Sequence, residues 1–452
     1  MLTYQDFLSR DVPIKDFIRM AINDHMSSEI YKTAILADKY DRQQNETIYN
    51  YTRMIMSSTG NLIRDITAAN NRLASNFFHR LNVQRCTYSL GNGCSFTKKD
   101  TKEKLGADFD TMIKKIGYKA LTHGLAFGYW NTDGLHLFPV TEFVPLWDED
   151  TGAIRAGIRW WQLDERKPVT AVLYEEDGVT KYHSAPGTSG MDFVEVEPKR
   201  AYKLIYSVSE ASGAEIIGEE NYTSLPIVPM WGSSLHQSTL VGMQRQIDSY
   251  DLIQSGFAND LTDCAQIYWI ISNAMGMDNN SLAQFRDRLL IQHIAVADTD
   301  TSDIKPYQQE IPHNARSAYL DMIRSRIYED FGAVDVHAIN AASTNDHIDA
   351  AYQPLDENAD DFEFEVITFV HQLLSLIGIE DTPIFKRNRI SNQKEQTEMV
   401  ATMAEYLDDK TILKKLPWID IDEVDSILHN RDLENQNRFD GEDKPKEDDT
   451  QV

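Results

Sequence analysis

The sequence predicts an α+β fold, in which helical segments and an antiparallel β-rich segment occupy separate stretches of the chain. The first observation is a hydrophobic period of three to four residues within residues 1–128. The second is a change to a period of two from Phe127, and the third is a return to helical spacing from Leu240. The 452 residues are 42% hydrophobic and 10% aromatic, which is enough apolar material for roughly two to four folded modules.

The helical period of the N-terminal part is clearest after residue 45. Apolar side chains recur there at steps of three and four, as they do in a helix with one buried face. We therefore expect helix throughout this stretch. The residues that carry the pattern are Ile48, Tyr51, Ile55, Leu62, Ile66, Leu73 and Phe77.

Residues 127–232 read as an antiparallel β meander. Asp133-Gly134 separates two alternating apolar runs, and a glycine at this place supplies the positive φ of a tight hairpin turn. Asp150-Thr151-Gly152 and Glu176-Asp177-Gly178 repeat the signal, and the run Leu225–Trp231 closes the segment. Asp150-Thr151-Gly152-Ala153 also matches the aspartic-protease tetrapeptide, but Asp148-Glu149 precede it and no second copy exists, so a turn is the better interpretation.

A heptad seam begins at residue 240 and continues for more than four heptads. It predicts a helix of roughly 45–50 Å. Asp248, Asp251, Asp260 and Asp263 lie on its other faces against the single base Arg245. A two-stranded coiled coil is one reading, yet the flanking positions lack alternating Glu and Lys, which favours packing against several neighbours. The seam residues are Leu240, Met243, Ile247, Tyr250, Gln254, Phe257, Leu261, Cys264, Tyr268 and Ile271.

A compact insert and two further helices follow. We expect strands at 289–297 and 304–311, and a helix at 314–331 with its apolar side at Leu320, Ile323, Ile327 and Phe331. A small polar loop then leads into a third long helix, 348–377, in which Pro354 should cause a kink or a restart. The segment between the two strands, 298–303, begins like a calcium loop but lacks glycine at its sixth position.

The charge balance excludes a broad basic surface that grips nucleic acid. The chain has 71 acidic and 44 basic residues, a net charge of −27. From Asp420 to Val452 there are 12 acids and 4 bases, and the part beyond about residue 435 has the composition of a disordered tail.

Sequence motifs of the common enzyme classes are missing. No phosphate loop, HExxH, GxSxG or GxGxxG occurs, and the 12 histidines show no metal-ligand spacing. Cys86, Cys94 and Cys264 read as reduced thiols, and neither a secretory signal nor a membrane-spanning segment is expected. We therefore predict a protein that is not an enzyme and needs no cofactor or metal.

The order of the segments, together with several short words, resembles the portal proteins of tailed bacteriophages of the siphophage type. The resemblance covers roughly residues 45–425. The matching words are Leu125–Trp130, Leu137–Trp147, Leu225–Pro229, Ile247–Asp251, Asn259–Leu261, Phe385–Arg389 and Leu413–Ile419.

This resemblance implies a ring, usually dodecameric, at one capsid vertex, through which genomic DNA is packaged and ejected. It implies a homo-oligomer whose partners are double-stranded DNA, the terminase large subunit, a head-completion or adaptor protein, and the major capsid and scaffolding proteins. It places the protein in the virion, after assembly in the bacterial cytoplasm. The implied parts are a wing (1–235), stem helices (236–273 and 313–333), a clip (274–312), a tunnel loop (334–347), a kinked helix (346–380), a wing strand (381–392), a crown (393–434) and an acidic tail (435–452).

A channel through which DNA slides should offer few Arg–phosphate contacts, so we expect Arg316 and Arg324 to pair mainly with neighbouring acids. The resemblance also implies three groups of functional residues, in the tunnel loop, the stem wall and the clip. The implied tunnel-loop residues are Ala338, Ile339, Asn340, Ala341, Ala342, Ser343, Thr344 and Asn345. The implied stem wall comprises Asp248, Asp251, Asp260, Asp263, Arg316 and Arg324, and the clip docking residues are Asp298, Asp300 and Asp303.

Two other readings stay open at this point. One is a non-portal structural or scaffold protein that oligomerises through a coiled-coil stem. The other is a carbohydrate-active enzyme, suggested by the tryptophans and acids of the meander, with Glu142, Asp148 and Glu175 as its carboxylates.

Overall fold

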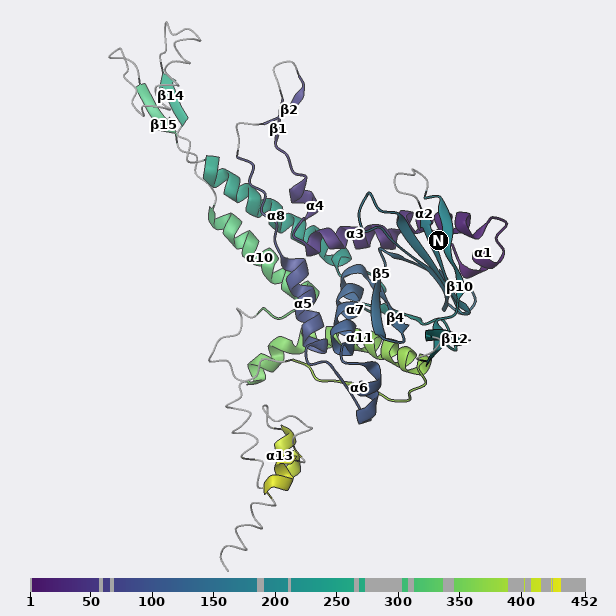
Figure 1. The fold of residues 1–452 in the computed structure, drawn as a ribbon. Helices are drawn as coiled ribbons and strands as arrows, with labels where there is room; N and C mark the ends of the chain where they lie inside the picture. The colour runs from purple at the N-terminus through teal and green to yellow at the C-terminus, as the bar shows by residue number, and fades with distance from the viewer. Residues whose placement is uncertain are drawn as a thin grey trace, which may run out of the picture. The chain divides into compact units, whose positions relative to one another are not determined.

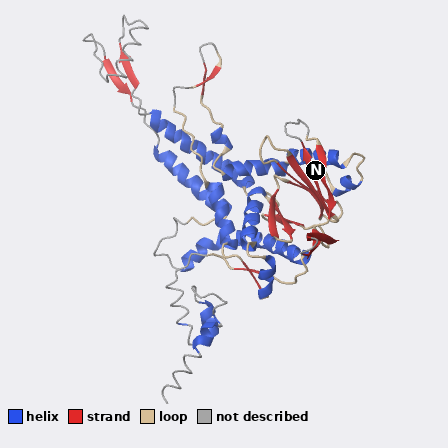
Figure 2. Ribbon diagram, viewed as in Figure 1, coloured by secondary structure: helices blue, strands red, loops and turns tan. Residues whose placement is uncertain are grey.

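A computed structural model describes the chain over residues 2–56, 60–65, 69–184, 191–209, 213–263, 268–272, 303–307, 313–335, 345–388, 402, 408–415, 424 and 426–431. It combines helices and antiparallel strands in separate stretches (Figures 1 and 2), which confirms the predicted α+β class. The chain divides into two compact units. The first contains Met1–Ala333 and Glu357–Arg387, and the second contains Val334–Asp356 and Asn388–Val452.

The N-terminal part is mainly helical, as predicted, but the helix expected across Ile48–Phe77 is wrong. Only residues 46–49 of that stretch are helical before a two-stranded hairpin forms. Gly60, shortly before the second strand, adopts a φ of +83°, which a continuous helix does not allow, so local backbone chemistry outweighs the apolar spacing. The elements are α1 (Tyr4–Leu8), α2 (Ile14–Ser27), α3 (Glu29–Asp41), α4 (Glu46–Tyr49), β1 (Met54–Met56), β2 (Leu62–Arg64), α5 (Phe77–Leu90), β3 (Cys94–Phe96), α6 (Lys99–Leu105) and α7 (Phe109–His123).

The predicted meander is present and wholly antiparallel. One sheet has the order β13-β4-β5 and a second has the order β10-β9-β8-β7-β6, while β11 and β12 form a separate pair. Asn131 pairs with Gly134 across the predicted tight turn. The strands are β4 (Leu125–Asn131), β5 (Gly134–Pro139), β6 (Phe143–Trp147), β7 (Ile154–Trp161), β8 (Val169–Glu175), β9 (Gly178–Ser184), β10 (Phe193–Arg200), β11 (Lys203–Ser209), β12 (Gly213–Glu220) and β13 (Ile227–Trp231).

The three acids that suggested a carbohydrate-active enzyme, Glu142, Asp148 and Glu175, lie in a turn or in ion pairs. The Asp148 carboxylate accepts hydrogen bonds from the backbone N–H groups of Asp150 and Thr151 at 2.9 and 3.0 Å, so the Asp-Thr-Gly sequence is a turn, as predicted. Glu142 pairs with Arg159 at 3.4 Å. Glu175 is bound likewise by Lys199 at 2.9 Å.

One face of the three-stranded sheet shares a hydrophobic core with α7 and the long helix α11 (Asn345–Leu376). Gly128 of β4 faces Phe369 of α11, and a Cβ at this position would lie 2.5 Å from the Phe369 ring. The absence of a side chain at Gly128 therefore allows the aromatic ring to pack on the sheet. Cys86 and Cys94 are buried free thiols, as predicted, and burial raises the pKa of each to about 12.

The C-terminal half contains two corrections to the predicted boundaries. The helix α8 runs from Leu240 to Asp263, but Tyr268 and Ile271, which continue the heptad pattern, belong to a strand. The run Tyr-Trp-Ile-Ile combines aromatic and β-branched residues, which favour a strand once a partner is present. That partner begins at Asp303, so the predicted second strand of the insert is confirmed, with an earlier end. The elements are β14 (Tyr268–Ser272), β15 (Asp303–Tyr307), α10 (His313–Phe331), β16 (Pro383–Phe385, paired with β3) and α13 (Asp409–Lys415).

Several expectations fall outside the described residues. These are the strand at 289–297, the docking residues Asp298 and Asp300, the tunnel-loop residues 338–344, Cys264, and the tail 435–452. Asp303 begins β15 and Asn345 begins α11, which includes Pro354 as predicted. None of the helices in the described ranges is both long and apolar enough to cross a membrane.

Candidate functional site: the stem helices and their polar strap

The two helices α8 and α10 form an antiparallel pair, here called the stem, that lies side by side in Figure 1. One end of the stem packs on α3 and α5. Leu240, Met243 and Ile247 of α8 are buried there with Ile327 and Phe331 of α10. This inner end is therefore anchored in the hydrophobic core of the protomer.

Burial along the stem decreases away from that core. The seam residues Leu240, Met243 and Ile247 are at most 4% exposed, whereas Leu261 near the other end is 55% exposed. Residues 313–319 of α10 are also mostly exposed. The outer half of the stem thus carries apolar side chains that the protomer alone leaves in water, as expected of helices that meet further neighbours.

A polar stripe on α8 binds an extended segment, residues 71–75, here called the strap. The backbone N–H of Ser75 donates to Asp251 at 2.8 Å, and that of Leu73 donates to Ser255 at 2.9 Å. The backbone N–H of Asn71 donates to Asn259 at 2.6 Å. Every second residue of the strap therefore meets every fourth residue of the helix.

This match of periods has a simple geometric cause. Two residues of an extended chain advance about 6.6 Å, and four residues of an α-helix advance about 6 Å and return to the same face. A strap can therefore donate successive N–H groups to acceptors at i, i+4 and i+8. The acceptor oxygens of α8 replace the strand that would otherwise satisfy these backbone groups.

The structure corrects the expected role of Asp251. This residue is 0% exposed, and its carboxylate accepts hydrogen bonds from the Asn45 side-chain amide and the Ser75 backbone. Burial raises the pKa of the Asp251 carboxyl, while the bonds from Asn45 and Ser75 lower it. Asp251 holds the strap inside the protomer and is not an exposed wall acid. The heptad pattern placed it off the seam but contained no sign of the strap.

The other expected wall residues have different surroundings. Asp248 accepts a hydrogen bond from the Tyr40 hydroxyl, and Asp260 forms an ion pair with Arg316, as we expected for that arginine. The Arg324 guanidinium lies 5.8 Å from the centre of the Tyr328 ring. Asp263 is the last residue of α8. Asp248 and Asp260 are half-buried, so each retains some access to solvent.

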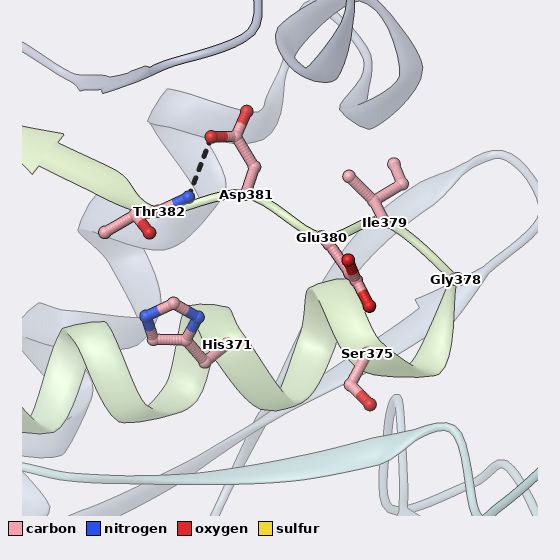
Figure 3. Close-up of a pocket in the computed structure, with 7 residues that line it drawn as sticks. All are labelled: His371, Ser375, Gly378, Ile379, Glu380, Asp381 and Thr382. Atoms are coloured by element: carbon pink, nitrogen blue, oxygen red, sulfur yellow. Dashed lines mark hydrogen bonds between the residues drawn. The ribbon is translucent and has the colours of Figure 1, made fainter.

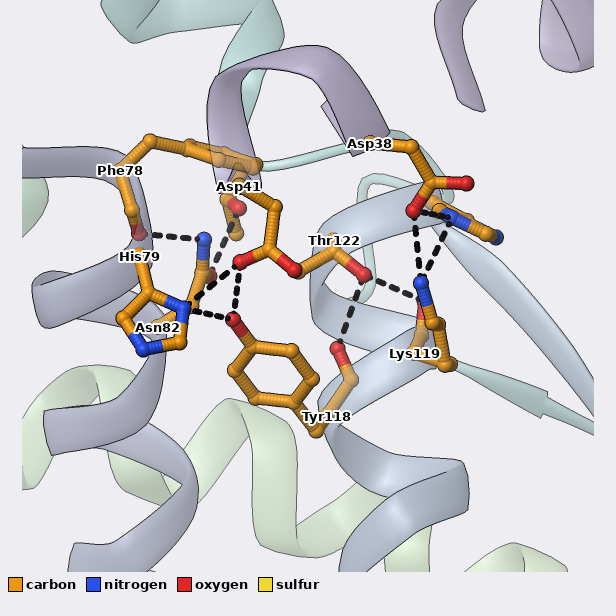
Figure 4. Close-up of polar contacts among 10 residues, drawn as sticks. Asp38, Asp41, Phe78, His79, Asn82, Tyr118, Lys119 and Thr122 are labelled. Carbon is orange, nitrogen blue, oxygen red and sulfur yellow. Dashed lines mark hydrogen bonds and ion pairs between the residues drawn. The ribbon is translucent and has the colours of Figure 1, made fainter. Parts of the chain in front are cut away.

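A polar network that the sequence did not reveal fixes α3 against α5 and α7 (Figure 4). Asp41 accepts hydrogen bonds from the Tyr118 hydroxyl and from His79 Nδ1, the latter at 2.9 Å. Asp38 accepts hydrogen bonds from Lys119 and His123 at 2.6 and 2.9 Å. Because α3 also supplies Tyr40, the network positions one of the residues that contact the stem.

The buried histidines predict a loss of stability in mild acid. His25 and His123 are 0% and 1% exposed, and burial lowers the pKa of both. Below their ordinary pKa of about 6.5, the unfolded chain binds protons that the folded chain excludes, so stability falls as the pH falls. We expect a loss of at most about 1.4 kcal/mol per histidine for each pH unit.

Thermal unfolding at pH 7.5, 6.5 and 5.5 measures this effect. His123→Gln should flatten the pH dependence, whereas His136→Gln, in β5 where the side chain is 45% exposed, should leave it unchanged. An unfolding temperature that stays constant from pH 7.5 to 5.5 would contradict the prediction.

An open hollow at the C-terminal end of α11 is structural in character (Figure 3). The Asp381 carboxylate in it accepts a hydrogen bond from the Thr101 hydroxyl at 2.6 Å and others from the backbone N–H groups of Thr97, Lys98 and Thr382. These bonds, that of Thr101 first, lower the pKa of Asp381 to about 2. The carboxylate ties the β3–α6 connection to the segment after α11 and is already occupied.

Comparison with known proteins identifies relatives over most of the chain. A family model described as phage portal protein, SPP1 Gp6-like, matches residues 29–437. A portal protein of Clostridium phage phiCD119 is 23% identical over 441 residues, covering 89% of this chain and 95% of that protein. The portal protein of Bacillus phage SPP1 is 22% identical over 441 residues, covering 90% and 84%. A chain in a solved neck of an empty GTA particle, computed with C6 symmetry, is 10% identical with a TM-score of 0.41, covering 75% and 88%.

Proposed function

Because the chain belongs to the SPP1 Gp6-like family of phage portal proteins, we propose that it forms the ring at one capsid vertex through which the genome is packaged and ejected. The family match over residues 29–437 is the observation that carries this function. The ring is a homo-oligomer located in the virion. Its role is structural and requires neither catalysis nor a cofactor.

The graded burial of the stem supports assembly of several copies. An isolated protomer leaves the outer apolar positions of α8 and α10 exposed, and Met322 of α10 is 56% exposed. Side-by-side packing of stems around a ring removes this surface from water on both flanks of each protomer. Burial of apolar area contributes about 25 cal/mol per Å² to such an association.

The passage of double-stranded DNA is the finer part of the proposal. The helix α8 carries four acids and one arginine, and Arg316 is already paired with Asp260. A wall in which Asp248, Asp260 and Asp263 remain acidic, and in which Arg316 and Arg324 engage groups of the protomer, offers few strong phosphate contacts. Low affinity for phosphate is what a sliding polyanion requires.

The partners follow from the same role. The clip, which includes Asp303 at the start of β15, docks the terminase large subunit during packaging and a head-completion or adaptor protein afterwards. The tunnel loop, residues 338–345, lies along the path of the DNA. Major capsid and scaffolding proteins surround the ring at the vertex, and assembly takes place in the cytoplasm of the bacterial host.

The mass of the assembled particle tests the function directly. Twelve chains of 51.7 kDa give about 620 kDa, and negative-stain images should show a ring with a central hole. Native mass measurement of the purified chain checks the number of copies. A dimer or trimer without a hole would favour the scaffold alternative and overturn the portal proposal.

A further inference from the structure

The β1–β2 hairpin exposes a cluster of large apolar side chains. All six strand residues are exposed, although five of them are large and apolar. Their exposed fractions are Met54 49%, Ile55 41%, Met56 71%, Leu62 65% and Ile63 47%. In a soluble protein, a cluster of this kind marks an interaction surface.

Both faces of the hairpin are uncovered. Met56 pairs with Leu62 and Met54 with Arg64, so these four side chains share one face, while Ile55 and Ile63 share the other. A two-stranded hairpin in water is marginally stable without a packed face. The hairpin therefore needs a covering partner, which the described part of the protomer does not supply.

The base of the hairpin is held firmly. Asp65 is 8% exposed and forms an ion pair with Arg53 at 3.4 Å, and the Asp65 backbone N–H donates to the Arg53 carbonyl at 3.0 Å. The strap begins at Asn71, whose backbone N–H donates to the Asn259 side chain near the outer end of α8. The hairpin thus emerges beside the outer half of the stem, as Figure 1 shows.

We propose that the β1–β2 hairpin of each protomer packs on the outer half of the stem of the next copy of the chain. This inference rests on the proposed ring, which needs one surface on each protomer that fits a different surface on its neighbour. Rotation around a ring keeps the height along the axis, so the hairpin meets the neighbouring stem at the level from which it emerges. On α10, Tyr319 in the outer half and Met322 at the midpoint of the helix are 37% and 56% exposed.

Charge complementarity supports the same partner. Residues 51–64 contain two arginines and no acid, in a chain whose net charge is −27. Arg53 is neutralised by Asp65 at the base, which leaves Arg64 as the cation on the face that carries Met54, Met56 and Leu62. On α10, the exposed Asp321 lies next to Met322. The contact joins apolar side chains and places opposite charges close to one another.

Paired aspartate substitutions in the full-length chain test the contact. Met56→Asp with Leu62→Asp should leave the unfolding temperature of the protomer close to that of the wild type, because both side chains are exposed. It should raise the concentration needed for half-assembly of the ring at least tenfold in mass photometry. The matched control is Val194→Asp with Ile217→Asp, on strands where the side chains are 66% and 65% exposed. The control should assemble like the wild type.

Cross-linking identifies the surface that receives the hairpin. A chain carrying Leu62→Cys and Met322→Cys should yield a ladder of covalent multimers with a bismaleimide, whereas Val194→Cys with Met322→Cys should not. If the aspartate variant assembles at the wild-type concentration, or the ladder is missing, the hairpin contact is overturned and the portal ring stands. If the wild-type chain forms no ring, the proposed function falls, and the contact with it.

Discussion

Replacing Asp251 by alanine should lower the free energy of unfolding by about 3 kcal/mol, the largest effect expected for a single stem acid. The substitution removes the acceptor of two buried donors, the Asn45 amide and the Ser75 backbone N–H. Each buried donor left without a partner costs about 1–3 kcal/mol. Chemical denaturation of the purified chain measures the change.

Asp260, another aspartate of α8, provides a matched control. Asp260 is half-buried and pairs with Arg316, so Asp260→Ala should cost no more than about 1 kcal/mol. Asp251→Asn should fall between the two, because the amide oxygen still accepts one hydrogen bond. Equal effects of Asp251→Ala and Asp260→Ala would show that the strap does not depend on Asp251.

Replacing Phe369 by alanine should destabilise the protein by about 4 kcal/mol, since its ring is 0% exposed in the core between the sheet and α11. Phe364→Ala, on the same helix but 65% exposed, should change stability by no more than about 0.5 kcal/mol. Thermal and denaturant unfolding with a common probe distinguishes the two variants.

The contact with Gly128 gives this prediction a second, independent readout. Gly128→Ala should destabilise the wild type, because the added Cβ would lie 2.5 Å from the Phe369 ring. In the Phe369→Ala background the ring is gone, and the same change should cost much less. A double-mutant cycle with no coupling between positions 128 and 369 would contradict this packing.

Elements specified by local chemistry could be predicted from the sequence. The turn at Asp133-Gly134 needs a residue that tolerates positive φ, and Gly134 has a φ of +147°. The buried face of α8 could be predicted from Leu240 to Ile247, because apolar residues recur there at the spacing of a helix. The family resemblance depended on the order of such elements, and the family match over residues 29–437 confirmed it.

Partners far away in the sequence decided the rest. Tyr268–Ser272 continues a helical pattern but forms a strand because Asp303–Tyr307 pairs with it. The sequence predicted that Asp251 is exposed to solvent. In the structure it is covered by the strap, in which Ser75 lies 176 residues earlier in the chain. The spacing of apolar residues predicts which side chains share a face, because the backbone geometry of a helix or a strand fixes that spacing. It does not report what covers that face, because burial is set by segments that only the folded chain brings together.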